Sequence, residues 1–502
     1  MQLTDIFRFP TVEKLAEHIG EGAEVIVEAR HNEISDRMDL SLIQKGMWFQ
    51  AKAAQMQHSS EIFMLAGSFT IDSGSFDHRR METAVNRLIS SNPELRTRIF
   101  EENYEPYLRY EEPFEYEVQH VKTDAGIDDV RAELEETVRK EAYSFDSFPL
   151  FSFRSAEAAD GKAVVAFGIH HIISDAHSVK LLLDELEGYY TESGSAAGMP
   201  GESGVPGKGA AADAADVVAD EPDAPEMSGT DEAVAREGRM LYNDYTVWQE
   251  ESLAAGSFSD DFEFWKKELD RLTPHRFTEA SGEWGDYRGA SVDTGIDRKV
   301  MQRLERMCAE SSSTIYDGIA AAVNVLMKYY FEDRHTAVGL GYAGRNLAAF
   351  ENTIGCFAVS SMECTQADSS MSFAELVSQT GRNIKESLAH SSLPFNVYAE
   401  NAGKGMEYSL MPYNIMINDI SGGNKAQAGS VFEDFRYSDA VVPADIMVAL
   451  EPGKTISIRY RKNMFEQAEI DVIRSDFRTV IEAAAAESDI TVAELERRLD
   501  NM

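Results

Sequence analysis

Two adjacent histidines and a nearby aspartate are the sharpest chemical feature of the sequence. His170 and His171 follow the apolar run 163–169, and Asp175 comes four residues after the second histidine. An imidazole has a reference pKa of about 6.5, so it can take up or release a proton near neutral pH. The pattern is consistent with a histidine-dependent enzyme.

A structural explanation of the same residues has comparable weight. The run 163–169 is rich in β-branched residues and predicts a buried strand that ends at the histidines. Neighbouring strand residues point to opposite faces, so if the strand geometry persists only one of His170 and His171 can face a given cleft, and the other is then a packing and hydrogen-bonding residue. Asp175 precedes a helical stretch, where its carboxylate could cap the helix or hold a cation.

A metal site is the weaker interpretation of this cluster. His170, His171, Asp175 and His177 all have side chains that can bind metals. Adjacent histidines diverge, however, and no second cluster completes a coordination shell. We therefore expect no metal here.

Composition limits the class of protein. The chain has 502 residues, of which 43% are hydrophobic, enough for more than one core. Its formal charge of -40, from 87 acidic and 47 basic residues, opposes binding to nucleic acid or to anionic membranes. Three scattered cysteines suit a reducing compartment, and neither a signal peptide nor an apolar run long enough for a membrane span is present. We expect a cytoplasmic protein.

The elements expected around the histidines mix helices with strands, which favours two mixed α/β lobes. Apolar periodicity predicts helices at residues 41–52, 80–90, 179–190, 237–254, 313–330 and 470–486. Strands are expected at residues 66–71, 163–170, 337–342 and 455–460. Residues 1–20 carry one short amphipathic helix, and residues 191–229 are so poor in large apolar side chains that they predict a mobile surface insertion.

The segment HHIISDA at residues 170–176 resembles the HHxxxDG signature of condensation domains of nonribosomal peptide synthetases. Other segments are similar to further motifs of this family and occur in the same order. These are SLIQKGMWF (41–49, the opening motif), SNPELRTRIF (91–100, RHExLRTxF), YNDYTVW (242–248, YxDYxxW), IGCF (354–357, the start of IGxFVNT) and HSSLPF (390–395, HxxxPF). Ordered matches from about residue 39 to near the C-terminus are far more specific than any single motif.

The resemblance implies an α/β, two-lobed, V-shaped fold like that of chloramphenicol acetyltransferase, with a central tunnel. It also implies a division of the chain. Residues 1–20 resemble the C-terminal remnant of a peptidyl carrier domain, 21–38 a linker, 39–190 the N-terminal lobe, 191–236 a disordered acidic insertion, and 237–502 the C-terminal lobe.

The activity that the resemblance implies is formation of an amide bond. The amine of an acceptor aminoacyl thioester attacks a donor acyl or peptidyl thioester, and both groups arrive on carrier domains. An α-amine has a reference pKa of roughly 7.7–8.0, so a useful fraction is already uncharged and the site mainly has to align the reactants and handle one proton. By the resemblance His171 is the catalytic residue, with His170 and an Asp175–Arg345 ion pair as structural support and with Ala176 and Ser178 in substrate binding.

The resemblance also implies the partners. The domain itself binds no cofactor, because phosphopantetheine is delivered by an upstream donor carrier and a downstream acceptor carrier. A neighbouring adenylation domain is expected, the module is expected to be monomeric, and no nucleic acid or membrane partner is expected.

Three departures from the family pattern keep alternatives open. Ala176 replaces the usual glycine, residues 358–360 read AVS instead of VNT, and residues 91–93 read SNP instead of RHE. If position 176 needed a positive φ or a close approach of the thioester, the added methyl group would hinder catalysis. A non-catalytic platform that only docks carriers therefore remains an alternative, as does an epimerising or ester-forming member of the same fold. Heterocyclisation is disfavoured because it replaces the two histidines with an aspartate-based motif.

Overall fold

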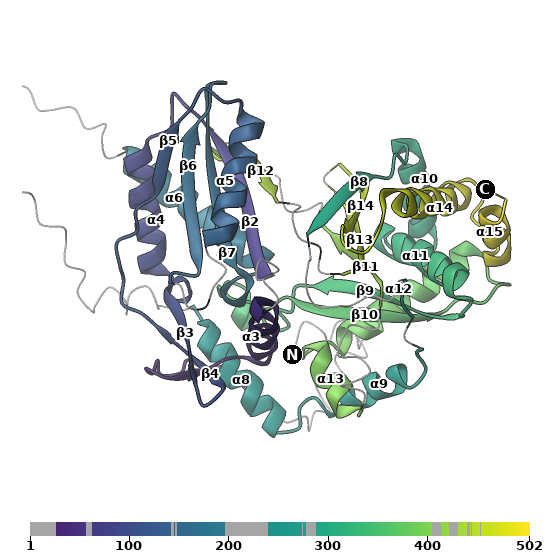
Figure 1. Ribbon diagram of the computed structural model, residues 1–502. Helices are drawn as coiled ribbons and strands as arrows, with labels where there is room; N and C mark the ends of the chain where they lie inside the picture. Colours follow the sequence, from purple (N-terminus) through teal and green to yellow (C-terminus); the bar gives the residue numbers. More distant parts are fainter. Residues whose placement is uncertain are drawn as a thin grey trace, which may run out of the picture.

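The computed structural model of the protein consists of two mixed α/β lobes. It describes residues 27–56, 63–141, 145, 148–195, 239–273, 275–277, 288–403, 413–420, 430–438, 442, 444–451 and 453–501. The lobes lie side by side and splay apart, so that the outline is a V (Figure 1). The expected two-lobed α/β fold is therefore confirmed. The carrier remnant at residues 1–20 and most of the insertion at 191–236 lie outside the described residues.

The N-terminal lobe is built on a five-stranded sheet with β7 at its centre. Its strand order is β12-β2-β7-β6-β5. The strands are β2 (Met64–Asp72), β5 (Gln119–Lys122), β6 (Phe151–Glu157), β7 (Lys162–His170) and β12 (Glu433–Tyr437). β7 pairs antiparallel with both β2 and β6, and Met64 lies opposite His170 in the register. The expected strands at 66–71 and 163–170 are present.

Helices cover both faces of this sheet, which explains why β7 reads as an unbroken apolar run. Val164 and Ala166 of β7 pack against α5, whereas Val165 and Phe167 belong to the larger core formed with α4 and α6. The helices are α4 (His78–Ser91), α5 (Ile127–Glu141) and α6 (Ala176–Ser195). The last turn of α6 occupies residues 191–195, so the insertion begins later than residue 191.

A small sheet and one helix form the base of the N-terminal lobe. The sheet has the order β1-β4-β3. Its strands are β1 (Met38–Asp39), β3 (Thr97–Glu102) and β4 (Glu105–Tyr110), preceded by a 3-10 turn at Pro93–Arg96. α3 (Leu42–Met56) follows β1 directly and contacts the 3-10 turn that carries His171.

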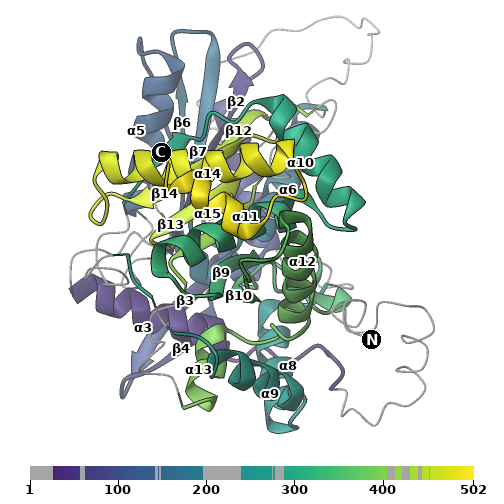
Figure 2. The ribbon, with the colours of Figure 1, turned by 90° about the vertical axis from the view of Figure 1, so that its right-hand side faces the viewer.

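The C-terminal lobe has a six-stranded sheet whose outer face is covered by helices (Figure 2). The strand order is β10-β9-β11-β13-β14-β8. The strands are β8 (Gly289–Asp293), β9 (His335–Tyr342), β10 (Val359–Gln366), β11 (Ile415–Asp419), β13 (Ile446–Leu450) and β14 (Ile456–Arg461). The helices of this face are α10 (Arg298–Glu310), α11 (Ile315–Phe331), α12 (Phe373–Ala389), α14 (Gln467–Ala486) and α15 (Val492–Leu499). α11 is the most deeply buried of them, as its apolar sequence predicts.

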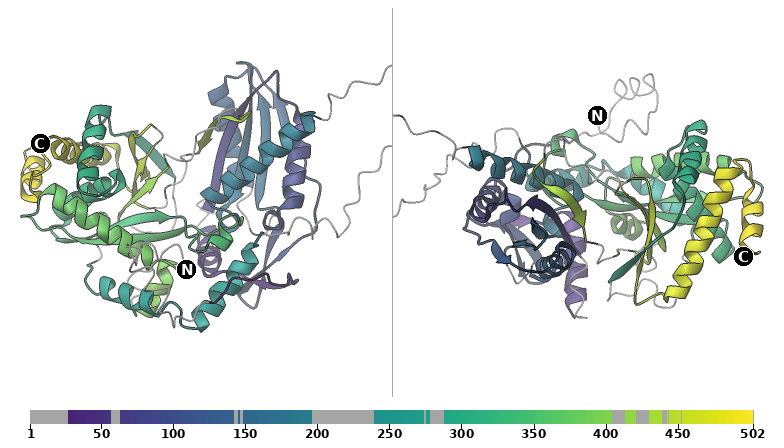
Figure 3. Two further views of the ribbon diagram at one scale, coloured as in Figure 1. Left: turned by 180° about the vertical axis from the view of Figure 1, so that it is seen from behind. Right: turned by 90° about the horizontal axis from the view of Figure 1, so that it is seen from above.

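An aromatic cluster packs the rest of the C-terminal lobe and reaches the lobe junction. Tyr242, Tyr245 and Trp248 of α8 share a core with Phe350 and Phe357. The helices here are α8 (Tyr242–Ala254), α9 (Ser259–Leu269) and α13 (Phe395–Asn401). Seen from above, the N-terminal and C-terminal lobes lie next to each other (Figure 3). Throughout the described part of the chain, no helix is both long and apolar enough to cross a lipid bilayer.

One strand crosses between the lobes. β12 comes from the C-terminal half of the chain but pairs antiparallel with β2 of the N-terminal sheet. Phe432, just before β12, stacks on Phe69 at a centroid distance of 4.0 Å, and the Arg131 guanidinium pairs with Asp434 at 2.9 Å. The expected assignment of all of 237–502 to the C-terminal lobe therefore does not describe β12.

Candidate active site at the end of strand β7

The two adjacent histidines are separated by a change in backbone structure. β7 ends at His170, and His171–Ile173 forms a 3-10 turn. The strand geometry on which the expected alternation depended does not continue to His171, so the 3-10 turn separates the two rings instead. His170 is fully buried between Phe63 and Phe145, whereas His171 is partly exposed.

Burial fixes the state of the His170 ring. Its Nδ1 accepts a hydrogen bond from the backbone N–H of Ile172 at 3.1 Å, which ties the ring to the turn. Burial, helped by the adjacent His171, lowers the pKa of His170 to about 3. His170 is thus neutral near pH 7 and holds the turn in shape.

The opening motif supports the turn from the other side. Gln44 of α3 donates from its side chain to the carbonyl of Ile172 at 2.8 Å. Ser41, just before α3, shares a hydrogen bond of 3.0 Å with the hydroxyl of Tyr242 from α8. The opening motif therefore binds both the turn that presents His171 and the YNDYTVW motif of α8.

Asp175 both caps a helix and binds a cation, the two roles that the sequence left open. Its Oδ1 accepts from the backbone N–H of Ser178 at 2.7 Å, which caps α6. Its Oδ2 accepts from Arg345 Nη1 at 2.5 Å and from the backbone N–H of Phe357 at 3.0 Å. The Asp175 side chain is 2% exposed, so it joins the lobes through an ion pair that is shielded from water.

Arg345 reaches this position from the loop after β9. It also donates to Ser178 Oγ at 2.8 Å and to the carbonyl of Thr353 at 2.9 Å, and its guanidinium lies 4.2 Å from the centroid of the Phe357 ring. The preceding Gly344 has a φ of 67°, and a Cβ there would lie 1.8 Å from the carbonyl oxygen of Phe357. Glycine is therefore required at 344 to bring the two loops together.

Ser178 has a different role from the one expected. It is fully buried, and its hydroxyl contacts the backbone N–H of Gly355 at 3.0 Å and the Gly355 carbonyl at 2.9 Å, besides Arg345. With these partners the side chain has no free group for a ligand. The burial argues against the substrate contact predicted for Ser178 and makes it a link between the lobes.

Ala176 is compatible with the local backbone. It is exposed, begins α6, and is not among the residues with a positive φ. Its carbonyl accepts a hydrogen bond from the Tyr437 hydroxyl of β12 at 3.3 Å. The positive φ considered as a reason for glycine is therefore not needed at this position.

Cys356 is the residue near His171 that the sequence did not indicate as functional. Its Sγ lies 3.4 Å from His171 Nδ1, although the two residues are 185 positions apart. Cys356 is fully buried, and burial raises the pKa of its thiol well above the ordinary value. The IGCF match placed this cysteine in a family motif, but no sequence spacing could show which side chain it touches.

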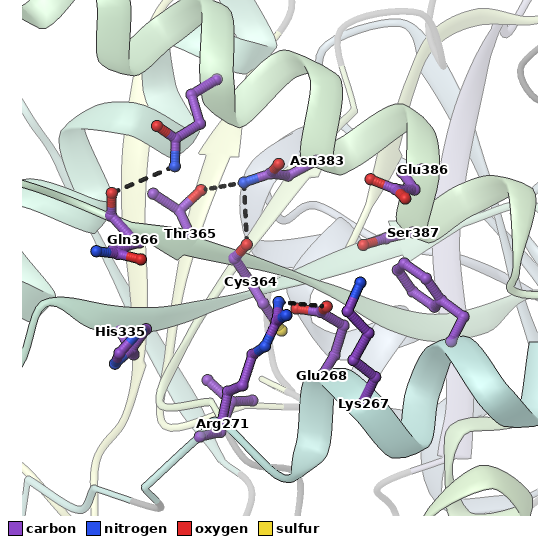
Figure 4. Close-up of a pocket in the computed structure, with 13 residues that line it drawn as sticks. Lys267, Glu268, Arg271, His335, Cys364, Thr365, Gln366, Asn383, Glu386 and Ser387 are labelled. Carbon is purple, nitrogen blue, oxygen red and sulfur yellow. Dashed lines mark hydrogen bonds and ion pairs between the residues drawn. The ribbon is translucent and has the colours of Figure 1, made fainter.

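A polar cavity of about 440 Å³ lies between α9, α12 and strand β10, and His171 is not among the residues that line it (Figure 4). Its polar groups largely bind one another. Asn383 and Gln379 donate to the carbonyls of Cys364 and Gln366 at 2.9 and 3.2 Å, and Arg271 donates to Glu268 at 3.1 Å. The expected tunnel at His171 stays a prediction. Within the described ranges, no group of three or more His, Cys, Asp or Glu residues could hold a metal ion.

The family model for the condensation domain matches residues 34–202 and 229–500. Tyrocidine synthase 3 of Brevibacillus parabrevis is 22% identical over 509 residues, which cover 99% of this chain but 7% of that protein. The chain therefore spans a small part of the length of this relative.

Solved structures with the same fold are also found. The X-domain from teicoplanin biosynthesis aligns with a TM-score of 0.72 at 15% identity, covering 93% of this chain and 99% of that one. The first condensation domain of the calcium-dependent antibiotic synthetase, in complex with a substrate analogue, aligns with a TM-score of 0.68 at 18% identity, covering 92% and 99%. At these identities the likeness shows the fold alone.

Proposed function

The chain belongs to the condensation-domain family of nonribosomal peptide synthetases, acyltransferases that form peptide bonds, and we propose that His171 is the residue at which its amide bond forms. The acceptor amine nitrogen attacks the carbonyl carbon of the donor thioester, and a C–N bond forms. The C–S bond then breaks, and the proton lost by the amine ends on the departing thiol. The acyl group thereby moves from donor carrier to acceptor.

One observation supports His171 above all. It is the partly exposed imidazole of the pair, and it stands at the end of the central strand where the lobes are joined by Asp175 and Arg345. Its Nδ1 contacts Cys356, so Nε2 is the nitrogen left for a substrate. His170 is neutral and buried and supports the turn without reaching the reactants.

The work required of His171 is modest. A substantial part of an α-amine is uncharged near pH 7 to 8, so the imidazole has to accept one N–H as the nitrogen attacks and to receive the proton released as the tetrahedral intermediate forms. Most of the rate gain then comes from aligning two tethered groups. Ala176, exposed at the start of α6, lies where it could contact the substrate arm.

The partners follow from the same proposal. Both reactants arrive on phosphopantetheine arms of carrier domains, one upstream and one downstream, and an adenylation domain loads the acceptor. The domain acts as a cytoplasmic, monomeric module of a larger synthetase. The match to a small fraction of Tyrocidine synthase 3 supports a place in a larger synthetase, and the charge of -40 fits a protein without a nucleic acid partner.

His171→Ala tests the proposal, with His177→Ala as a matched control. His177 lies six residues away in the first turn of α6, where its Nε2 bonds to the carbonyl of Glu351 at 2.9 Å. We expect His171→Ala to lower dipeptidyl product on loaded carriers by about 10²-fold or more, because proton handling and amine alignment are both lost. His177→Ala should stay within a few-fold of wild type, by mass spectrometry of the carriers.

Two results would overturn the assignment. Unchanged turnover in a folded His171→Ala variant would remove His171 from the reaction. Absence of product from the wild type with every loaded carrier pair, together with retained carrier binding, would instead identify the domain as a docking platform.

A further inference from the structure

We propose that Cys356 is a positioning residue that orients the His171 ring through its buried thiol. The inference rests on the proposed function of His171 and adds a residue to that site. Its basis is the Cys356 Sγ to His171 Nδ1 distance of 3.4 Å, within hydrogen-bonding range for sulfur.

The backbone that carries the sulfur is held by hydrogen bonds at three successive residues, 355, 356 and 357. The Tyr242 hydroxyl donates to the carbonyl of Cys356 itself. The preceding Gly355 is bound through both its N–H and its carbonyl by Ser178, and the N–H of the following Phe357 is bound by Asp175. The thiol therefore occupies a fixed point relative to α6 and to the turn that carries His171.

The chemistry of a buried thiol defines what this contact can do. Burial raises the pKa of Cys356 well above the ordinary thiol value, so the sulfur stays protonated and carries no charge. We assign the hydrogen bond as donation from His171 Nδ1–H to Sγ. That direction leaves the Nε2 lone pair free to accept an N–H of the attacking amine.

The neutral partner also means that Cys356 supplies no counter-charge to the His171 ring. A carboxylate next to Nδ1 would stabilise the imidazolium through its charge and make the ring more basic. A thiol gives only a weak hydrogen bond, so His171 acts mainly by orienting the amine. The proton that it receives from the tetrahedral intermediate is then readily released to the departing sulfur.

Three variants separate this role from simple packing. Cys356→Ser keeps a polar partner for Nδ1, whereas Cys356→Val fills the space without one and keeps water out. Cys308→Val is the matched control, because Cys308 is also fully buried but packs in the core of the C-terminal lobe. We expect Cys356→Val to lower kcat on the order of tenfold to hundredfold with little change in KM, while Cys356→Ser keeps most activity.

The pH profile gives a second readout that packing would not move. The imidazolium keeps its Nδ1–H donor, so loss of the acceptor disfavours the charged ring. The acid limb of kcat should therefore move to lower pH in Cys356→Val and stay close to wild type in Cys356→Ser. The pH dependence of His171 carbethoxylation, followed by mass spectrometry, should also move to lower pH in Cys356→Val and stay close to wild type in Cys356→Ser. This measurement does not require turnover.

The outcomes distinguish failure of the inference from failure of the proposed function. If His171→Ala is inactive but Cys356→Val matches Cys356→Ser in kcat and in both pH profiles, Cys356 only packs and the inference is overturned. If Cys356→Val is more active than Cys356→Ser, packing also explains the site. If His171→Ala retains full turnover, the proposed function itself is wrong, whatever the cysteine variants do.

Discussion

Replacing Asp175 by alanine should test the ion pair that joins the two lobes. The change removes the acceptor of three donors at once, namely Arg345 Nη1 at 2.5 Å, Phe357 N–H at 3.0 Å and Ser178 N–H at 2.7 Å. Arg345 keeps its Nη2 contacts to Ser178 Oγ and to the Thr353 carbonyl, but its guanidinium loses its only carboxylate among the described residues. A buried positive charge is left without a counter-charge.

The expected magnitude follows from how deeply the pair is buried. The side chains of Arg345 and Asp175 are 6% and 2% exposed, so water cannot replace the lost carboxylate. Breaking such a pair from one side costs about 3–5 kcal/mol, and the lost helix cap alone would account for about 1 kcal/mol of that range. If the N-terminal lobe unfolds as a unit, its melting temperature should fall on the order of 10 °C.

Asp77→Ala provides the matched control by differential scanning fluorimetry. Asp77 caps α4 of the same lobe by accepting from Arg80 N–H at 2.9 Å, so its loss should cost about 1 kcal/mol. Adding Arg345→Met to Asp175→Ala should recover part of the lost melting temperature, because it removes the unpaired charge. The reasoning would be refuted if Asp175→Ala and Asp77→Ala had the same melting temperature. It would also be refuted if the double variant Asp175→Ala/Arg345→Met melted at a lower temperature than Asp175→Ala.

Three further outcomes follow from other buried groups. Burial raises the pKa of Glu363 from 4.5 to about 7, so its contribution to stability is lost as pH rises through 7. The melting temperature of Glu363→Gln minus that of wild type should therefore be larger at pH 8 than at pH 5. An equal difference at the two pH values would contradict this. Burial lowers the pKa of His170 from 6.5 to about 3, so its contribution is lost as pH falls through that range, and His170→Asn should flatten the acid side of a melting-temperature profile. Gly344→Ala should unfold more than 5 °C below wild type, since its Cβ would meet the Phe357 carbonyl; an unchanged melting curve would show that the loop can move.

Strong local patterns made much of the fold predictable. The apolar run of β7 and the periodicity of α4, α6, α11 and α14 are local properties, and the structure places these elements within a few residues of the expected ranges. The ordered motifs correctly indicated the family. The pairing of Asp175 with Arg345 came from the family resemblance and from the need of a buried carboxylate for a cation.

Features created by tertiary contact were not predictable. β12 is short, largely exposed and carries charged residues, so nothing in its own sequence marks it as a strand of the other lobe. The contact between Cys356 and His171 depends on two loops from different halves of the chain. Ser178 was expected at the substrate, yet its burial depends on the approach of Gly355 and Arg345, which local spacing does not reveal.

The crossing of β12 has a consequence for how the molecule could be divided or moved. A fragment ending before this strand would leave the backbone of Gly67, Ser68 and Thr70 as an open edge, which invites association with other chains. The strand also works as a tether. Any hinge motion that opens the angle between the halves must either carry those five residues along or peel them from β2, so the range of opening is limited by one short hydrogen-bonded ribbon.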